Sequence, residues 1–336
     1  MLTDTFFRDG HRLALAALTL TAFLGAPTPS WPQTPPGAAS PAAGARAQLP
    51  GVYRLPLGDF VVTSLSDGTV PQDLHKLLTG TTPAEVDGLL NRSFLKNPVE
   101  ASINAFLIDT GSRLVLVDTG AGQFFGPGFG GKLLASLAAA GYQPQQIDDI
   151  LITHVHTDHS GGLVEGERMV FPNATIHVGK PDVDFFLNPQ NAAATGYDRK
   201  YFDEAAKALG PYLRAGKIKT FTGRTQILPG ITAIPTPGHT PGHSFFLIES
   251  RGQELEVIGD IVHVASVQFP EPRITIVYDV DPAAAAAQRT KQFAAVASER
   301  RLVAAAHLPF PGIGHIRTET SGYTWVPVDY TNRVER

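Results

Sequence analysis

At the centre of the chain stand Thr153-His154-Val155-His156-Thr157-Asp158-His159, with three imidazoles and one carboxylate within six residues. Imidazole nitrogen and carboxylate oxygen are the ligands that zinc and similar divalent ions take in proteins. The chain has 11 histidines among 336 residues, so a chance cluster of this density is improbable. The spacing differs from that of a zinc finger, and no cysteine is present to complete one.

This motif is predicted to lie on a loop between a strand and the next element. Residues 148–152 are typical of a short buried strand that ends at Thr153, and Ser160-Gly161-Gly162 allows a sharp turn. Loops at strand ends are held by a rigid sheet and often carry catalytic groups. Four ligand-type side chains on such a loop can face two adjacent metal ions.

Further ligand-type residues follow later predicted strands. His239 comes after a predicted strand at 231–235, and Asp260 and His307 follow strand patterns in the same way. Glycines next to His239 and Asp260 let the backbone approach closely. Each signal is modest alone, but together and in this order they predict one site.

The composition is that of a globular protein with a large core. The chain is 43% hydrophobic and 17% charged, with a formal net charge of −4. Because the net charge is negative, the composition gives no indication of a nucleic-acid partner. The absence of cysteine excludes disulfides and thiolate ligands, so histidine and acidic side chains must supply the metal site.

Alternating and helical patterns predict an α+β fold with a layered mixed sheet, because strands come in runs with helices between them. The predicted helices cover 132–140, 181–187, 198–215 and 282–299. The predicted strands cover 52–57, 60–65, 104–109, 113–118, 148–152, 175–178, 231–235, 244–249, 255–259 and 301–306.

The first 50 residues are predicted to lie outside this fold. Arg8, His11 and Arg12 precede the apolar run 13–24, which is typical of a signal peptide over 1–26 with a cleavage site between 26 and 47. The Pro-, Ala- and Gly-rich stretch 27–50 predicts a disordered linker before a single domain at 51–336. We expect a periplasmic or secreted protein that is free of the membrane after processing, with an uncleaved membrane tether as the alternative.

The motif at 154–159, followed by Gly-His239, Gly-Asp260 and His307, resembles the metallo-β-lactamase superfamily. The resemblance covers the chain from Gly51 onward. It implies an αββα sandwich with two divalent metal ions at one edge; zinc is expected, with manganese, iron or cobalt as alternatives. By position it assigns His154, His156 and His239 to one ion, Asp158, His159 and His307 to the other, Asp260 as a bridge, and Asp118 and His243 as groups that orient ligands.

Several segments resemble methyl parathion hydrolase and its lactone-cleaving, dihydrocoumarin hydrolase-like relatives: 57–60, 65–70, 125–127, 211–217 and 307–317. This narrower resemblance implies export, a homodimer and an aromatic pocket over the metals. It places Phe125, Phe186 and Phe202 in that pocket, while ordinary core packing is the alternative for all three.

Four residues depart from the organophosphate-degrading members of that group. Leu78 stands where Arg is expected, and His263 stands where those enzymes have Leu. Ile276 and Tyr278 replace a smaller Thr and Leu. These substrate-binding positions add bulk and a polar ring, so they favour a flat ester such as an aryl lactone.

The resemblance implies a metal-dependent hydrolase in which a metal-bridging hydroxide attacks lactones and aryl esters, with promiscuous phosphotriester hydrolysis. Asp158 and Asp260 are the expected catalytic carboxylates, and Asp158 could carry a proton to the leaving group. The alternatives are a dedicated phosphotriesterase, a β-lactamase and a metal-binding protein without activity. The acidic bridge Asp260 argues against a β-lactamase, and the complete ligand set argues against an inactive protein.

Overall fold

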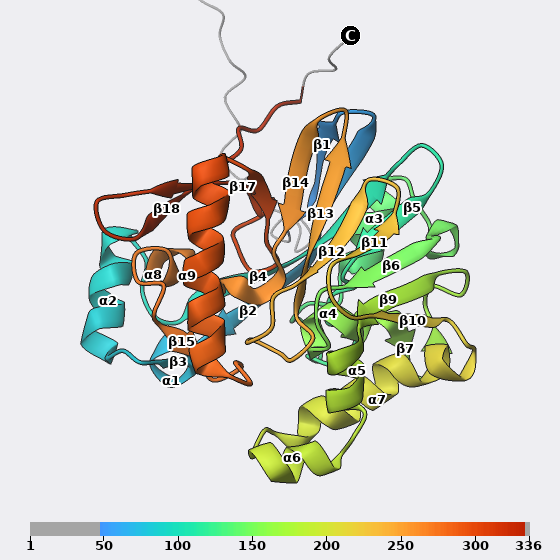
Figure 1. Cartoon of the computed structure of the whole chain (residues 1–336), viewed down its shortest axis with the longest axis horizontal. Coiled ribbons are helices and arrows are strands. Elements are labelled where there is room, and N and C mark those ends of the chain that lie inside the picture. Colours follow the sequence, from blue (N-terminus) through green and yellow to red (C-terminus); the bar gives the residue numbers. More distant parts are fainter. Residues whose placement is uncertain (1–47, 333–336) are drawn as a thin grey trace, which may run out of the picture. The chain divides into compact units, whose positions relative to one another are not determined.

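Two seven-stranded sheets form the centre of the protein in the computed structural model, which describes residues 48–332 (Figure 1). The first sheet has the order β1-β2-β4-β5-β6-β9-β10, and the second has the order β11-β12-β13-β14-β16-β17-β18. The predicted signal peptide and nearly all of the predicted linker lie outside the described residues. Residues 49–332 form one compact unit.

The first sheet changes from antiparallel to parallel in its middle. Its antiparallel strands are β1 (Val52–Leu57), β2 (Phe60–Gln72), β4 (Val99–Asp109) and β5 (Leu114–Val117). Its parallel continuation consists of β6 (Asp149–Ile152), β9 (Thr175–Gly179) and β10 (Ile218–Phe221). Parallel neighbours require crossover segments, and α3 (Leu133–Ala139) and α7 (Arg199–Arg214) lie in those connections.

The second sheet is antiparallel except between its fourth and fifth strands, which are parallel. It consists of β11 (Thr225–Leu228), β12 (Ile231–Pro235), β13 (Ser244–Ser250), β14 (Gln253–Val257), β16 (Leu302–Ala304), β17 (Ile313–Thr318) and β18 (Tyr323–Pro327). The long helix α9 (Pro282–Glu299) supplies the crossover between the two parallel strands and runs along this sheet (Figure 1).

Apolar side chains fill three layers. Phe106 and Val117 of the first sheet share a buried cluster with Phe246 and Val257 of the second. The outer face of the first sheet is covered by α3, α5 (Lys180–Phe186) and α7, and that of the second by α9. Adjacent residues on a strand point to opposite faces, so the neighbour of Phe246, Phe245, packs toward α9. Full burial of each such ring contributes about 2–3 kcal/mol.

This arrangement of helix, sheet, sheet and helix confirms the predicted αββα sandwich of the α+β class. The structure differs from the prediction in four sheet strands that were not predicted, β10, β11, β17 and β18, and in the ends of several elements. The predicted strand 255–259 ends at Val257, and Asp260 lies on a short 3₁₀ turn, Gly259–Ile261.

Smaller elements decorate the two sheets. They are α1 (Leu74–Leu77), α2 (Pro83–Arg92), α4 (Thr157–Ser160), α6 (Gln190–Thr195), α8 (Ala265–Gln268) and the strand pairs β3 (Leu78–Thr79) with β15 (Thr275–Ile276) and β7 (Val164–Glu165) with β8 (Arg168–Met169). None of the helices within residues 48–332 has the length and apolar character needed to cross a bilayer.

Candidate metal centre

All seven predicted ligands come together where four strands end. The loop and short helix α4 after β6 carry four of them, and the segments after β12, β14 and β16 each carry one. The two sheets therefore deliver ligands from both sides to a single edge. Two groups of these side chains have geometry suited to a metal ion, and Asp260 contacts both.

We call the first group the imidazole trio: His154, His156 and His239. His156 Nδ1 lies 3.0 Å from His154 Nε2 and 3.0 Å from His239 Nε2. Asp260 Oδ2 lies 3.6 Å from His154 Nε2 and 3.4 Å from His239 Nε2. All three rings are buried. Four ligand atoms thus converge on one buried point beside the cavity.

Hydrogen bonds on the far side of these rings fix which nitrogen carries the proton. His239 Nδ1 lies 2.8 Å from Asp279 Oδ1, so it must be the donor to that carboxylate. Thr153 Oγ1 donates its only hydrogen to Asp118 Oδ2 at 2.7 Å, so it accepts from His154 Nδ1 at 3.1 Å. In both neutral rings Nε2 is left with a lone pair directed into the trio.

We call the second group the mixed triad: Asp158, His159 and His307. His307 Nε2 is 3.5 Å from Asp158 Oδ2 and 3.1 Å from Asp260 Oδ2. His159 Nε2 is 3.2 Å from Asp260 Oδ1 and 3.8 Å from Asp158 Oδ1. Among the described residues, buried His159 Nε2 and Asp260 Oδ1 have no hydrogen-bond partner.

The outer nitrogens of the mixed triad are also anchored. His159 Nδ1 donates to Asp118 Oδ2 at 2.8 Å, and His307 Nδ1 donates to the Ser102 carbonyl at 2.8 Å. Their inner nitrogens, Nε2 of His159 and of His307, face the oxygens of Asp260. Donor atoms held this close need a cation between them, either a proton or a metal ion, so the donor set fits two divalent ions.

The two groups differ in electrostatics. Burial, together with repulsion from neighbouring imidazoles, holds the pKa of each trio histidine well below its ordinary value. Burial also lowers the pKa of His307, but Asp260 and Asp158 outweigh it and raise that pKa to about 9. The same carboxylates raise the pKa of His159 well above its ordinary value despite burial. Positive charge is therefore favoured most beside Asp158 and Asp260.

Asp118 and His243 occupy the orienting positions that the resemblance implied. Asp118 accepts from the Thr153 backbone as well as from its hydroxyl, and its φ of 59° is a left-handed conformation that is costly for a residue with a Cβ. His243 Nε2 accepts from the Asp260 backbone at 3.0 Å. A Cβ at Gly259 would lie 2.6 Å from His243 Nε2, so this close approach requires glycine.

His263 is an eighth ligand-type side chain at the centre. Its Nε2 lies 3.1 Å from Asp260 Oδ2, and its ring stacks on His307 with centroids 5.3 Å apart. The ring is buried, and neither ring nitrogen has a hydrogen-bond partner among the described residues. His263 was predicted as a substrate-binding residue, but the structure places it behind the cavity wall and against the shared carboxylate.

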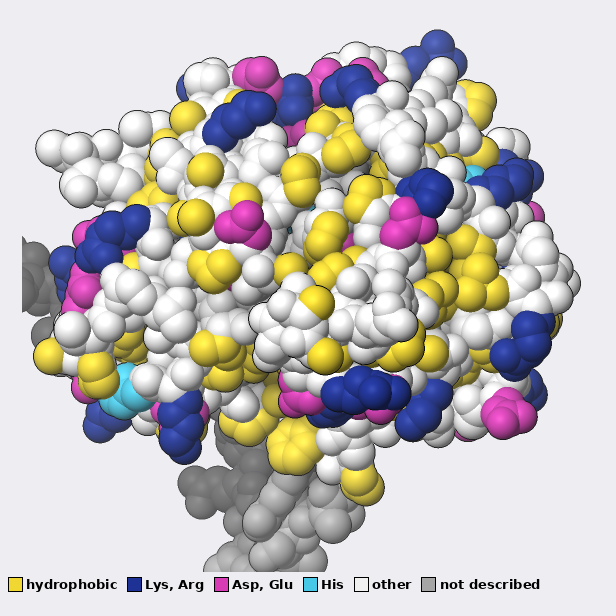
Figure 2. All heavy atoms as spheres, turned by 60° about the horizontal axis from the view of Figure 1, so that its bottom comes forward, with side chains coloured by type: hydrophobic (Ala, Val, Ile, Leu, Met, Phe, Trp, Pro, Cys, Tyr) yellow, Lys and Arg dark blue, Asp and Glu magenta, His cyan; other side chains and the backbone are white. Residues whose placement is uncertain are grey.

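A cavity of about 320 Å³ opens above the ligands and is lined by His156, Asp158, Asp260 and His307 of the centre. Its aromatic residues are Phe124, Phe125, Phe129, Tyr201 and Tyr278. A volume of this size suits a small molecule. Few histidine atoms appear on the surface in Figure 2, which agrees with the burial of the ligand rings.

The structure places some of the predicted pocket residues at the cavity and the others in apolar clusters. Phe125 and Tyr278 line the cavity. Phe186 and Phe202 are buried in the core beneath α5 and α7, so the alternative of core packing describes them. Leu78 and Ile276 pair across β3 and β15 inside a separate apolar cluster. The resemblance implied that these residues lie near the site but could not show which face each one presents.

Asp182 is a buried residue of the site that sequence reasoning missed. Its carboxylate accepts from the Val155 backbone at 2.8 Å and from Thr240 Oγ1 at 2.8 Å. It thereby ties the segment between His154 and His156 to the segment beside His239. Asp279, behind His239, and Tyr197, behind His156, were missed as well. The hydrogen-bond partners of these residues lie far along the chain, so no local sequence pattern marks them.

Comparison with known proteins supports this reading of the site. Residues 99–307 match the family model described as Metallo-beta-lactamase superfamily. A crystal structure of "hydrolase AbOPH in beta lactamase superfamily" is 37% identical, with a TM-score of 0.81, and the match covers 85% of this chain and all of that chain. The dizinc quorum-quenching lactonase AidC, solved with the product N-hexnoyl-L-homoserine, is 29% identical with a TM-score of 0.77, over 84% of this chain and 99% of that one.

Curated relatives include an N-acyl homoserine lactonase of Bacillus sp, which is 29% identical over 164 residues. That alignment covers 44% of this chain and 58% of the relative. The N-acyl homoserine lactonase of Bacillus cereus is 26% identical, over 48% of this chain and 64% of the relative. The matched region thus spans less than two thirds of these curated relatives.

Proposed function

Because the chain belongs to the metallo-β-lactamase superfamily, we propose that it is a metal-dependent hydrolase that opens lactone rings and cleaves aryl esters. Phosphotriester hydrolysis is proposed as a side activity. The observation that carries the proposal is the convergence of seven ligand atoms, with their lone pairs turned inward, at the floor of a cavity of about 320 Å³. The likeness to a dizinc lactonase over 84% of the chain supports the same substrate class.

Different residues of the chain would have different roles in such a reaction. The imidazole trio, the mixed triad and Asp260 would hold two divalent ions. When bound, such ions supply Lewis acidity toward the ester carbonyl and lower the pKa of water to near neutrality. Asp158, whose side chain is 17% exposed and lines the cavity, is placed to move a proton at its carboxylate toward the leaving oxygen.

The cavity wall selects the shape of the substrate. Phe125 and Tyr278 offer apolar ring surfaces on which a flat ester can lie, and the buried floor excludes bulk water. Apolar pockets discriminate by only about 1–3 kcal/mol per methylene, so related esters and phosphotriesters are expected to share the site. A dedicated phosphotriesterase is the alternative outcome.

The test is a side-by-side measurement of kcat/KM on dihydrocoumarin and methyl paraoxon with zinc or manganese supplied. We expect the lactone to be turned over with the higher kcat/KM. An N-acyl homoserine lactone belongs in the same panel, because lactonases of that name are among the relatives. A strong preference for the phosphotriester would overturn the lactonase proposal. Turnover of nitrocefin alone would point to a β-lactamase instead.

Export to the periplasm and homodimerisation complete the proposal. Both come from the N-terminal sequence pattern and the narrower resemblance, and the N-terminal residues 1–47 lie outside the described structure. Fractionation of cells that express the full chain, and light scattering of the purified protein, test them separately.

A further inference from the structure

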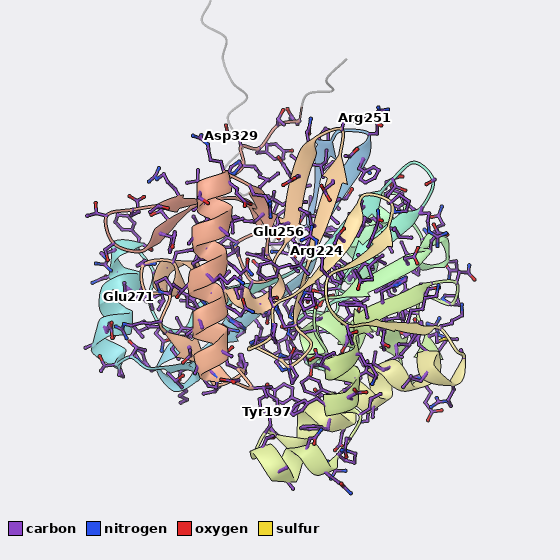
Figure 3. The ribbon with its side chains drawn as sticks, viewed as in Figure 1. Tyr197, Arg224, Arg251, Glu256, Glu271 and Asp329 are labelled. Atoms are coloured by element: carbon purple, nitrogen blue, oxygen red, sulfur yellow. The ribbon has the colours of Figure 1, made fainter. Side chains whose placement is uncertain are left out.

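A phenol hydroxyl stands behind one of the candidate ligands. Tyr197 lies in the connection between α6 and α7, and in Figure 3 it is labelled between α6 and the lower end of α9. Its Oη is 2.7 Å from the Tyr278 carbonyl oxygen and 2.8 Å from His156 Nε2. One hydroxyl therefore joins a ligand loop of the first sheet to the segment that leads into α9.

The number of hydrogens fixes the direction of both bonds. A carbonyl can only accept, so the single hydroxyl hydrogen of Tyr197 goes to Tyr278. The Tyr197 oxygen must then accept from His156, which requires the proton of that ring to be on Nε2. His156 Nδ1 is left with its lone pair, and this is the atom that lies 3.0 Å from the other two inner nitrogens of the imidazole trio.

Among the three trio histidines, His156 differs in the hydrogen-bond partner of its outer nitrogen. The outer nitrogen of His239 donates to a carboxylate, and that of His154 donates to a hydroxyl that is itself bound to a carboxylate. His156 has only the neutral oxygen of Tyr197, whose ring lies nearly parallel to it, at an interplanar angle of 8° with the centroids 6.0 Å apart. Its orientation therefore depends on a residue from outside the ligand loops.

We propose that Tyr197 is a positioning residue that presents His156 Nδ1 to the metal ion and couples this ligand to the cavity wall through Tyr278. The inference rests on the proposed metal site but not on the proposed substrate. Outer partners of metal-bound histidines fix the ring orientation, and their loss typically lowers metal affinity by about 10–100-fold. Tyr278 itself lines the cavity. A shift of the Tyr278 backbone would therefore move the Tyr197 hydroxyl and, with it, the ring of His156.

Tyr201 provides a matched control. Its ring also packs against His156, with centroids 5.2 Å apart, and it contacts Tyr197 at 5.1 Å. Within residues 48–332, however, its hydroxyl makes no hydrogen bond to a candidate ligand. Tyr197→Phe and Tyr201→Phe therefore remove the same atom from neighbouring rings and differ in whether that atom holds His156.

The test is a zinc titration of both metal-free variants in competition with a chelator of known affinity. Tyr197→Phe is expected to lose about 10–100-fold in affinity for one of the two ions, while Tyr201→Phe binds both ions as the wild type does. Equal affinities in wild type and Tyr197→Phe, or an equal loss in both variants, would overturn the proposal. Thermal unfolding of the metal-free proteins verifies that both variants fold.

A second readout needs neither metal nor substrate. Nitrogen-15 NMR of the metal-free protein, labelled at histidine, reports which nitrogen of His156 carries the proton. We expect a proton on Nε2 in the wild type and in Tyr201→Phe, and a mixture of both forms in Tyr197→Phe. A proton on Nδ1 in the wild type would contradict the inference. A failure of lactone turnover would leave both readouts intact, so the two proposals can be judged separately.

Discussion

The imidazole trio and the mixed triad hold their ligands by different means. The trio is buried, carries no acidic member of its own and is aligned entirely by hydrogen bonds on the outer side of its rings. The mixed triad includes a carboxylate at the cavity, and neighbouring negative charge favours a cation there. The trio therefore depends on preorganised lone pairs, whereas the mixed triad depends more on charge. Asp260 contacts members of both groups.

The largest expected effect comes from the residue that the two groups share. Asp260→Ala removes the carboxylate that contacts His239 at 3.4 Å and His307 at 3.1 Å, so both ions should be lost together. Loss of a hydrogen-bond partner behind a ligand costs up to about 100-fold in activity. Loss of the shared ligand itself should lower kcat/KM by more than this. Elemental analysis of bound metal, measured beside activity, checks this. Full activity, or one retained ion per chain, would contradict the idea that both ions depend on Asp260. Asp87→Ala, at an exposed carboxylate far from the ligands in sequence, is the control.

An intermediate effect should separate the two groups. Asp279→Asn removes the carboxylate behind His239 alone, so it should weaken only the ion at the trio, by about 10–100-fold. Asp118→Asn affects His159 directly and His154 through Thr153, so it should weaken both ions. Zinc competition titrations of the two variants make the comparison. If both variants weakened the same single step, the division into two groups would be wrong.

The smallest expected effect concerns substrate preference. His263→Leu removes an imidazole that stands 3.1 Å from Asp260 and stacks on His307. We expect the ratio of phosphotriester to lactone turnover to rise by about 10-fold, because the ring supports Asp260 and His307, which line the cavity. The two values of kcat/KM, measured on one preparation, give the ratio. An unchanged ratio would remove His263 from the account of specificity, and Ile276→Val is a control of similar burial.

Much of the fold was predictable because many strands are short apolar runs and the helices carry recognisable residues at their ends. Phe245 and Phe246 face opposite sides of β13, as a predicted strand requires. The helix predicted at 282–299 was confirmed to the residue, with Asp281 accepting from the Ala284 backbone at its start. Strands β10, β11, β17 and β18 were missed, because polar residues interrupt their apolar pattern.

The candidate ligands could be found from sequence because each carries a metal-binding group and follows a strand. The residues that align them could not be found in this way. Asp182 and Asp279 act through partners far along the chain, such as Gly242 and His239, and such pairs leave no local spacing. Tyr197 was missed for a related reason: only folding shows that its hydroxyl meets a ligand rather than solvent.

The most direct test of this account is a calorimetric titration of the metal-free protein with zinc. The structure predicts two ions per chain, bound in two resolvable steps, because the imidazole trio and the mixed triad are organised differently around one shared carboxylate. Two steps that both vanish in Asp260→Ala would support the account. A single ion per chain, or two ions whose binding is unaffected by that substitution, would contradict it.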